Sequence, residues 1–269
     1  MTPTVSERPI VDFLIIGAQK AGTTAAAFNL AHHPDVSIFS GVTQFMQREI
    51  EFFNQHWAEG SDWYRAHFDY SRLMVGEKTA ELLHRLVTHQ RIKQTVPLVK
   101  LIIFLRNPVE RAFSQWKMST RPNWGEQRTF PDIIEEERGL IASHTYRDAF
   151  YRCSDENPAC WREGYLLRGF YAEQIKHLLK FFPMESIHIA IAERVRRNMA
   201  LEYSNIWRFL GLEPILTTFQ ERFVSTNNAK LDPLTREHLN AFYEPHNKQL
   251  FELLGARIAE WSECSINST

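Results

Sequence analysis

Residues 12–24 constrain the fold of this chain more than any other stretch. They read Asp-Phe-Leu-Ile-Ile-Gly-Ala-Gln-Lys-Ala-Gly-Thr-Thr, which is a short apolar run, a loop bounded by Gly17 and Gly22, and the start of an alanine-rich segment. This order predicts a strand, a tight loop and a helix, so that backbone N–H groups and a helix N-terminus surround one point. The stretch therefore predicts a binding site for an anionic group.

The spacing of the two glycines matches the nucleotide P-loop pattern G-x-x-x-x-G, with one difference. Thr23 follows the second glycine where a Walker A loop has a lysine, and Lys20 lies inside the loop instead. Lys20, Thr23 and Thr24 can all donate hydrogen bonds to phosphate oxygens. A plain strand–turn–helix junction, whose glycines serve geometry alone, is the simpler alternative. The displaced lysine favours a phosphate donor other than ATP.

Strand-like and helical patterns alternate along the chain. The runs that are apolar or β-branched enough for buried parallel strands are 13–16, 36–39, 98–105 and 187–191. The helical patterns cover 23–33, 80–94, 108–119, 164–182 and 233–254. Pro245 is expected to break the last of these. The alternation predicts an α/β fold with three α/β/α layers and a central parallel sheet.

The length of 269 residues and a 44% hydrophobic, 23% charged composition predict one globular domain over residues 1–269. Residues 121–163, rich in Trp, Arg, Pro and charge, interrupt the alternation and are expected to cover a site. Within them, Cys153 and Cys160 flank an acidic segment, and their role stays open.

The composition excludes several classes of partner. A net charge of −1 gives no global basic field, so nucleic acid is not expected to bind. No secretory signal is visible, and the apolar runs are too short to span a bilayer. With 3 cysteines there is no obligatory disulfide framework, which fits a reducing compartment. We expect a cytoplasmic protein, and the oligomeric state stays open.

A second anion motif follows the predicted strand that ends at Leu105. A magnesium-dependent NTPase needs an acidic residue near such a strand end to hold the metal. This chain has Arg106-Asn-Pro there, with Ser114 eight residues further on. An arginine repels a metal ion and attracts a second phosphate. A surface salt bridge and a solvated hydroxyl would each explain one residue alone, but together the two predict a second phosphate site without metal.

With these motifs in order, the chain resembles the sulfotransferases that depend on 3′-phosphoadenosine-5′-phosphosulfate (PAPS), of the heparan sulfate N- and O-sulfotransferase type. Residues 17–24 resemble that family's 5′-phosphosulfate loop, and residues 105–114 resemble its 3′-phosphate motif. The further segments that agree are 48–53, 63–64, 76–79, 169–174 and 181–183. The resemblance covers residues 12–255 and implies the P-loop nucleotide-binding sulfotransferase fold.

The resemblance also implies roles for individual residues. The residues implied to hold the 5′-phosphosulfate are Gly17, Gln19, Lys20, Ala21, Gly22, Thr23 and Thr24. Those implied to bind the 3′-phosphate are Arg106 and Ser114, with Lys230 as a substitute for a Lys-Gly-Arg segment that this chain lacks. The implied catalytic residues are Glu49 as the base, with Lys20 and Lys78 near the transferred group. The product would be adenosine 3′,5′-bisphosphate, and no metal would be needed.

Residues 48–53, Arg-Glu-Ile-Glu-Phe-Phe, allow a separate interpretation. If extended, they place Glu49 and Glu51 on one face and apolar side chains on the other. A half-buried edge with two solvated carboxylates is the alternative. Many relatives have histidine at the second polar position, so Glu51 departs from the family. The ionisations of two carboxylates at one site would be coupled, which raises the proton affinity of one of them. The two carboxylates would also suit an acceptor that is less anionic than a sulfated glycan.

The sequence therefore predicts an enzyme of the EC 2.8.2 type that moves a sulfuryl group to a hydroxyl or amine. Near-neutral charge and Glu51 favour a small-molecule acceptor that contacts Glu51, for example a cationic or neutral natural product such as a guanidinium alkaloid. A glycan or glycolipid acceptor is the alternative. A kinase using Mg-ATP and a non-catalytic nucleotide-binding protein are more distant ones.

Overall fold

The computed structural model describes residues 8–39, 42–43, 46–47, 49–122, 125–152, 164–220 and 227–263. Its centre is a five-stranded parallel sheet in the order β2-β5-β1-β6-β7. The strands are β1 (Phe13–Gly17), β2 (Val36–Phe39), β5 (Met74–Lys78), β6 (Lys100–Leu105) and β7 (Ile187–Ile191). A separate antiparallel pair joins β3 (Val42–Thr43) to β4 (Met46–Gln47).

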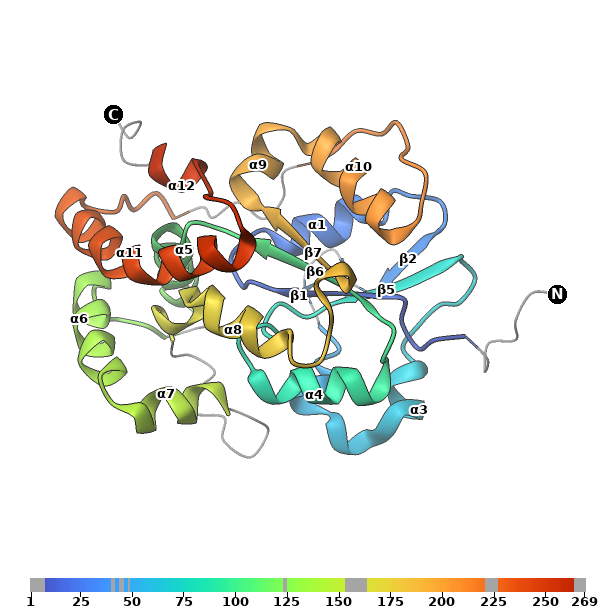
Figure 1. Ribbon diagram of the computed structural model, residues 1–269, viewed down its shortest axis with the longest axis horizontal. Helices are drawn as coiled ribbons and strands as arrows, with labels where there is room; N and C mark the ends of the chain where they lie inside the picture. Colours follow the sequence, from blue (N-terminus) through green and yellow to red (C-terminus); the bar gives the residue numbers. More distant parts are fainter. Residues whose placement is uncertain are drawn as a thin grey trace.

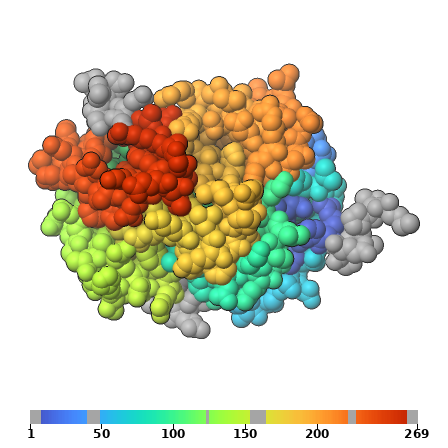
Figure 2. Space-filling model, viewed as in Figure 1, coloured from blue at the N-terminus to red at the C-terminus, as the bar shows by residue number. Residues whose placement is uncertain are grey.

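Helices cover both faces of the sheet, which confirms the predicted α/β architecture. Helices α1 and α10 lie on one side in Figure 1, and α4 and α8 lie on the other. The helices are α1 (Thr23–Leu30), α2 (Phe52–Gln55), α3 (Gly60–Arg65), α4 (Leu86–Thr95), α5 (Pro108–Ser119), α6 (Phe130–Ile141), α7 (His144–Tyr151), α8 (Tyr171–Leu178), α9 (Ala192–Arg197), α10 (Met199–Leu210), α11 (Pro233–Leu254) and α12 (Glu260–Glu263). On the face seen in Figure 2, the yellow segment around α8 packs against red α11 and green α4.

Strand β5 was not among the predicted strands, although it lies second in the sheet. Its sequence is Met-Val-Gly-Glu-Lys, which carries two charges and a glycine. A Cβ atom on Gly76 would lie 2.2 Å from the Phe13 ring, so only glycine lets β1 and β5 pack here. Glu77 and Lys78 are both buried. Distant partners decide that this charged segment becomes a central strand.

Three predicted helices are shorter in the structure, and the first of them, predicted over 23–33, ends at Leu30. The pattern at 80–94 begins its helix only with α4 at Leu86, and residues 164–182 form a 3₁₀ turn (Leu167–Gly169) followed by α8. By contrast, the prediction that Pro245 breaks the last helix is wrong, because α11 continues through it. Tyr243 and Leu250, on either side of the proline, are buried, and their packing outweighs the backbone hydrogen bond that a proline removes.

A second hydrophobic cluster lies beside the main one, which surrounds the sheet. It gathers apolar side chains of α5, α6, α7, the turn before α8, and α11. Helices α6 and α7 lie within the described part of residues 121–163, which covers 121–122 and 125–152, and they bury their apolar faces in this cluster. Residues 123–124 and 153–163, with both cysteines of that region, lie outside the described residues. Coverage of a site by this region stays a prediction.

Within the described ranges, no helix combines the length and the apolar character that crossing a bilayer requires.

Candidate active site

A cleft of about 1500 Å³ opens at the carboxyl edge of the sheet. Because the strands are parallel, the segments that follow them emerge at the same edge. The loop after β1, the end of β5, Arg106 after β6 and helix α9 after β7 all contribute to its walls. Among the predicted site residues, those that line the cleft are Gln19, Lys20, Ala21, Gly22, Thr23, Thr24, Glu49, Glu51, Lys78, Arg106, Ser114 and Lys230.

Gly17 is the one predicted site residue outside the lining, and its role is geometric. A Cβ atom at this position would lie 2.7 Å from Cβ of Leu83, closer than packed carbon atoms approach. Glycine lets β1 end tightly against the segment that follows β5. The prediction that Gly17 itself contacts a bound nucleotide receives no support from its position.

The loop after β1 holds its shape through unusual backbone angles. Lys20 has φ 72°, in the left-handed region, and Gly22 has φ 93° at the N-cap of α1. The carbonyl of Lys20 accepts a hydrogen bond from Nη1 of Arg106 at 3.1 Å. A lysine in the left-handed region is uncommon, so the contacts around the loop must stabilise this conformation. The contact joins the two anion motifs, which are far apart in the sequence.

Lys20 lies in a strongly cationic environment. Its Nζ is 3.5 Å from Sδ of Met118. Burial lowers the pKa of Lys20 to about 8, and the charges of Arg121, Arg106 and Arg111 add to the effect. Like charges so close together favour binding of an anion that neutralises them.

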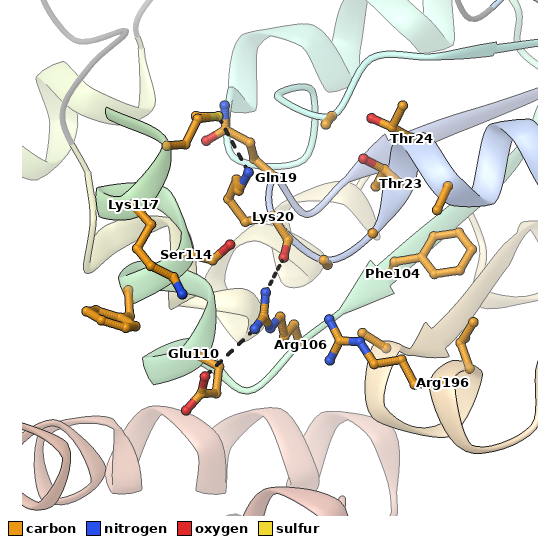
Figure 3. A pocket seen from close by; sticks show the side chains of 18 of the residues that line it. Gln19, Lys20, Thr23, Thr24, Phe104, Arg106, Glu110, Ser114, Lys117 and Arg196 are labelled. Carbon is orange, nitrogen blue, oxygen red and sulfur yellow. Dashed lines mark hydrogen bonds and ion pairs between the residues drawn. The ribbon is translucent and has the colours of Figure 1, made fainter. Parts of the chain in front are cut away.

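Arg106 and Ser114 face the same part of the cleft from the end of β6 and from α5 (Figure 3). Arg106 is 3.7 Å from the carboxylate of Glu110, while its Nε atom is buried without a hydrogen-bond partner among the described residues. Lys117 lies one turn after Ser114 on α5 and also lines the cleft. Arg106 nevertheless lines the cleft with 17% of its side chain exposed, so an anion in the cleft can contact its guanidinium group.

On another wall of the cleft, Lys78 forms an ion pair with Oε1 of Glu49. Lys78 is 2% exposed and Glu49 is 15% exposed, so both groups are largely withdrawn from water. The backbone N–H of Ala80 also lies 3.3 Å from each oxygen of Glu49. A carboxylate and an ammonium are thereby fixed at one point, as a reaction that moves a proton and develops negative charge requires.

The segment around Glu51 differs from the extended form considered above. Glu51 has φ 57° and forms the N-cap of α2. Both carboxylates nevertheless reach the cleft, while Ile50 and Phe52 are buried. Phe52 stacks on Tyr64 with ring centroids 4.4 Å apart, which fixes the segment against α3. Arg48 lies outside the described residues.

Glu51 lies beside other carboxylates of the cleft. Burial, together with the charges of Glu49, Glu81 and Glu77, raises its pKa to about 7 against the opposing charge of Arg85. Three carboxylates, those of Glu49, Glu51 and Glu81, line this wall. Glu49 is paired with Lys78, and Glu110 on α5, Asp232 and Glu237 line the cleft as well, so acidic and basic side chains alternate around it.

Glu81 also connects the wall to the loop. Its oxygens accept hydrogen bonds from Nε of Arg85 at 3.1 Å and from Nε2 of Gln19 at 3.1 Å. Arg168, 2% exposed, donates to both Gln19 and Glu81. This closed set of contacts fixes the amide of Gln19 at the start of the loop.

Sequence reasoning missed several residues of the cleft. They are Glu81, Lys117, Arg121 and Arg196. Helical spacing from Ser114 could have indicated Lys117. Arg196 belongs to no anion motif, and only the adjacency of β6 and β7 brings it to the site.

The known proteins to which this chain is similar include several sulfotransferases. The sulfotransferase domain family matches residues 11–249 of the chain. The membrane-associated sulfotransferase kil1 of Dictyostelium discoideum is 26% identical over 90% of this chain and 65% of its own length. The bifunctional heparan sulfate N-deacetylase/N-sulfotransferase 2 of Bos taurus is 28% identical over 93% of this chain. This chain spans 30% of that bovine protein.

Among solved structures, the fold is similar to that of a sulfotransferase from Alicyclobacillus acidocaldarius. The two chains are 27% identical and superpose with a TM-score of 0.72, covering 95% of this chain and 99% of that one.

Proposed function

This chain belongs to the sulfotransferase domain family. From that premise we propose that it is a sulfotransferase and that it transfers the sulfuryl group of PAPS to a small-molecule amine or hydroxyl. The 5′-phosphosulfate would lie against the loop after β1, where Lys20, Thr23 and Thr24 face the cleft. The 3′-phosphate would bind Arg106 and Ser114. This donor fits a cleft with two cationic regions that are joined by the contact between Arg106 and the loop.

The reaction joins the acceptor nitrogen or oxygen to sulfur while the bond from sulfur to the bridging oxygen of the 5′-phosphate breaks. The acceptor's proton passes to Glu49, and the electron pair of the broken bond stays on adenosine 3′,5′-bisphosphate. Lys20 and Lys78 stabilise the charge that grows on the bridging oxygen. Because that charge is absent from the ground state, the stabilisation lowers the barrier rather than merely tightening binding.

The acidic wall favours a cationic or neutral acceptor. Glu49 is paired with Lys78, and Glu81 is paired with Arg85 and Arg168. Glu51 lines the cleft beside them, so a positively charged amine or guanidinium would gain an ion pair with Glu51 that a polyanion would not. A natural product of that charge is therefore the preferred acceptor. The alternative is a glycan, since the bovine relative is named for heparan sulfate.

The observation that carries the proposal is the ion pair of Glu49 and Lys78 in the same cleft as both anion motifs. The test is to mix the protein with PAPS and a panel of amines, guanidines, phenols and N-desulfated oligosaccharides, and to measure release of adenosine 3′,5′-bisphosphate. We expect the highest turnover with a cationic or neutral small molecule. An N-desulfated oligosaccharide as the best acceptor would contradict the acceptor class alone.

A matched pair of variants tests the assigned base. Glu49→Gln is expected to abolish most turnover, whereas Glu135→Gln, at a glutamate 80% exposed on α6, should leave it unchanged. Tight binding of Mg-ATP with none of adenosine 3′,5′-bisphosphate would instead show that the donor is wrong.

A further inference from the structure

We infer that Arg196 is a second guanidinium for the 3′-phosphate of the donor, and that it sets the preference for a 3′,5′-bisphosphate over a 5′-monophosphate. The inference rests on the proposed function and adds a residue that neither anion motif contains. Arg196 lies on α9, far from both motifs in the sequence.

The sheet brings Arg196 to Arg106. Strands β6 and β7 are parallel neighbours, with Leu105 paired to Ile191 at their carboxyl ends. Arg106 follows β6 directly, and α9 follows β7 directly. Both arginines line the cleft, and Figure 3 shows the guanidinium of Arg196 directed toward that of Arg106.

Helix α9 is fixed in place by its own contacts. The backbone N–H of Asn107 donates to Oε1 of Glu193 at 3.0 Å, which joins α9 to the residue after Arg106. Trp261 donates to the other oxygen of Glu193 at 3.1 Å. Val195 is buried next to Arg196 in the sequence. Arg196 is therefore presented from a backbone that is anchored to the 3′-phosphate motif.

The charges favour an anion between the two arginines. Burial lowers the pKa of Arg106, and the charge of Arg196 is the next largest cause. Glu110 compensates Arg106 in part, but it also accepts a hydrogen bond from Arg236. Two guanidinium groups that face one another are stabilised by a phosphate, whose oxygens can accept hydrogen bonds from both.

The position of Arg196 also distinguishes the site of the 3′-phosphate from the site of the 5′-phosphosulfate at the loop after β1. In the sheet order, β6 lies between β1 and β7, so Arg106 stands between the loop after β1 and Arg196. The loop with Lys20 is the site proposed for the 5′-phosphosulfate. Arg196 is therefore placed for a phosphate on the far side of Arg106, which is the 3′-phosphate.

Isothermal titration calorimetry with adenosine 3′,5′-bisphosphate and adenosine 5′-monophosphate tests the inference. Arg196→Ala should weaken bisphosphate binding by about tenfold or more, the loss expected for a charge-assisted contact. Monophosphate binding should stay unchanged, which also shows that the variant is folded. Arg196→Lys should recover part of the loss, because it keeps the charge without the planar fork.

Arg197→Ala is the matched control. Arg197 neighbours Arg196 on α9 but is 65% exposed and pairs with Glu260 at 3.7 Å. It should bind both nucleotides as the wild type does. Equal losses for both nucleotides in Arg196→Ala, or no loss for either, would overturn the inference. A wild-type protein without preference for the bisphosphate would contradict the proposed function itself.

Discussion

Lys78, the last residue of β5, donates a hydrogen bond to Oε1 of Glu49, a residue that lies outside the main sheet. The pair unites the proposed base with a cation that can stabilise the leaving group. Because Lys78 is 2% exposed, removal of either partner leaves a buried charge without its counterion. The two residues should therefore act as one unit.

The first prediction concerns that pair. We expect Lys78→Met and Glu49→Gln each to reduce kcat by about a hundredfold or more, as loss of a positioned acid–base group does. The double variant should lose far less than the product of the two effects, because each single change already disables the unit. Steady-state kinetics with PAPS measures all three. Fully multiplicative losses would show that the two residues act independently.

Lys20 should make donor binding depend on pH. Its pKa is lowered to about 8 by burial and by Arg121, Arg106 and Arg111, so the free protein loses this charge as the pH rises through about 8. A bound anion favours the charged form, so affinity for adenosine 3′,5′-bisphosphate should fall between pH 7 and pH 9. Calorimetry at several pH values measures the change. Lys20→Arg, which stays charged, should remove this dependence, and an unchanged dependence would contradict the assignment.

Glu51 should make acceptor binding depend on pH in the opposite sense. Burial, together with Glu49, Glu81 and Glu77, raises its pKa to about 7 against the opposing Arg85. Its carboxylate is therefore neutral below about pH 7 and negative above it. For a permanently cationic acceptor such as a quaternary amine bearing a hydroxyl, KM should fall as the pH rises through this range.

The control for that prediction is Glu51→Gln, which has a similar shape and no charge. In this variant the KM for the cationic acceptor should be higher above pH 7 and should lose its dependence on Glu51 ionisation. A neutral acceptor should show little change in either protein. If KM for the cation rose with pH in the wild type, the acidic wall would have no role in recognising charge.

A fourth prediction concerns the strand that sequence reasoning missed. Gly76→Ala would place a Cβ atom 2.2 Å from the Phe13 ring, at the contact of β5 with β1. We expect a loss of about 2 kcal/mol or more in the free energy of unfolding, as for overpacked cores. Urea denaturation followed by circular dichroism measures it.

Gly139→Ala is the control for Gly76. Gly139 lies in α6, and a Cβ atom added there would meet no neighbouring side chain or segment within 4 Å, so alanine should be neutral or stabilising. Equal stability of the two variants would show that the contact of Phe13 with Gly76 is not needed for the sheet.

The sequence alone determined the features that are continuous along the chain. Strands β2 and β7 and helix α5 have the bounds that their patterns predicted, and both anion motifs line one cleft. These features are local, because a run of apolar residues or a glycine loop specifies its own backbone. The resemblance that depended on these motifs correctly indicated the sulfotransferase family.

Only the tertiary structure decided the rest. It buries Glu77 and Lys78 in a central strand, carries α11 through Pro245, and sets Arg196 opposite Arg106. In each case the outcome depends on partners distant in the sequence. A buried charge is stable only beside a hydrogen-bond partner or counterion, and α11 continues through Pro245 because Tyr243 and Leu250 pack on either side of it. The order of the strands supplies those partners, and no local pattern contains that order.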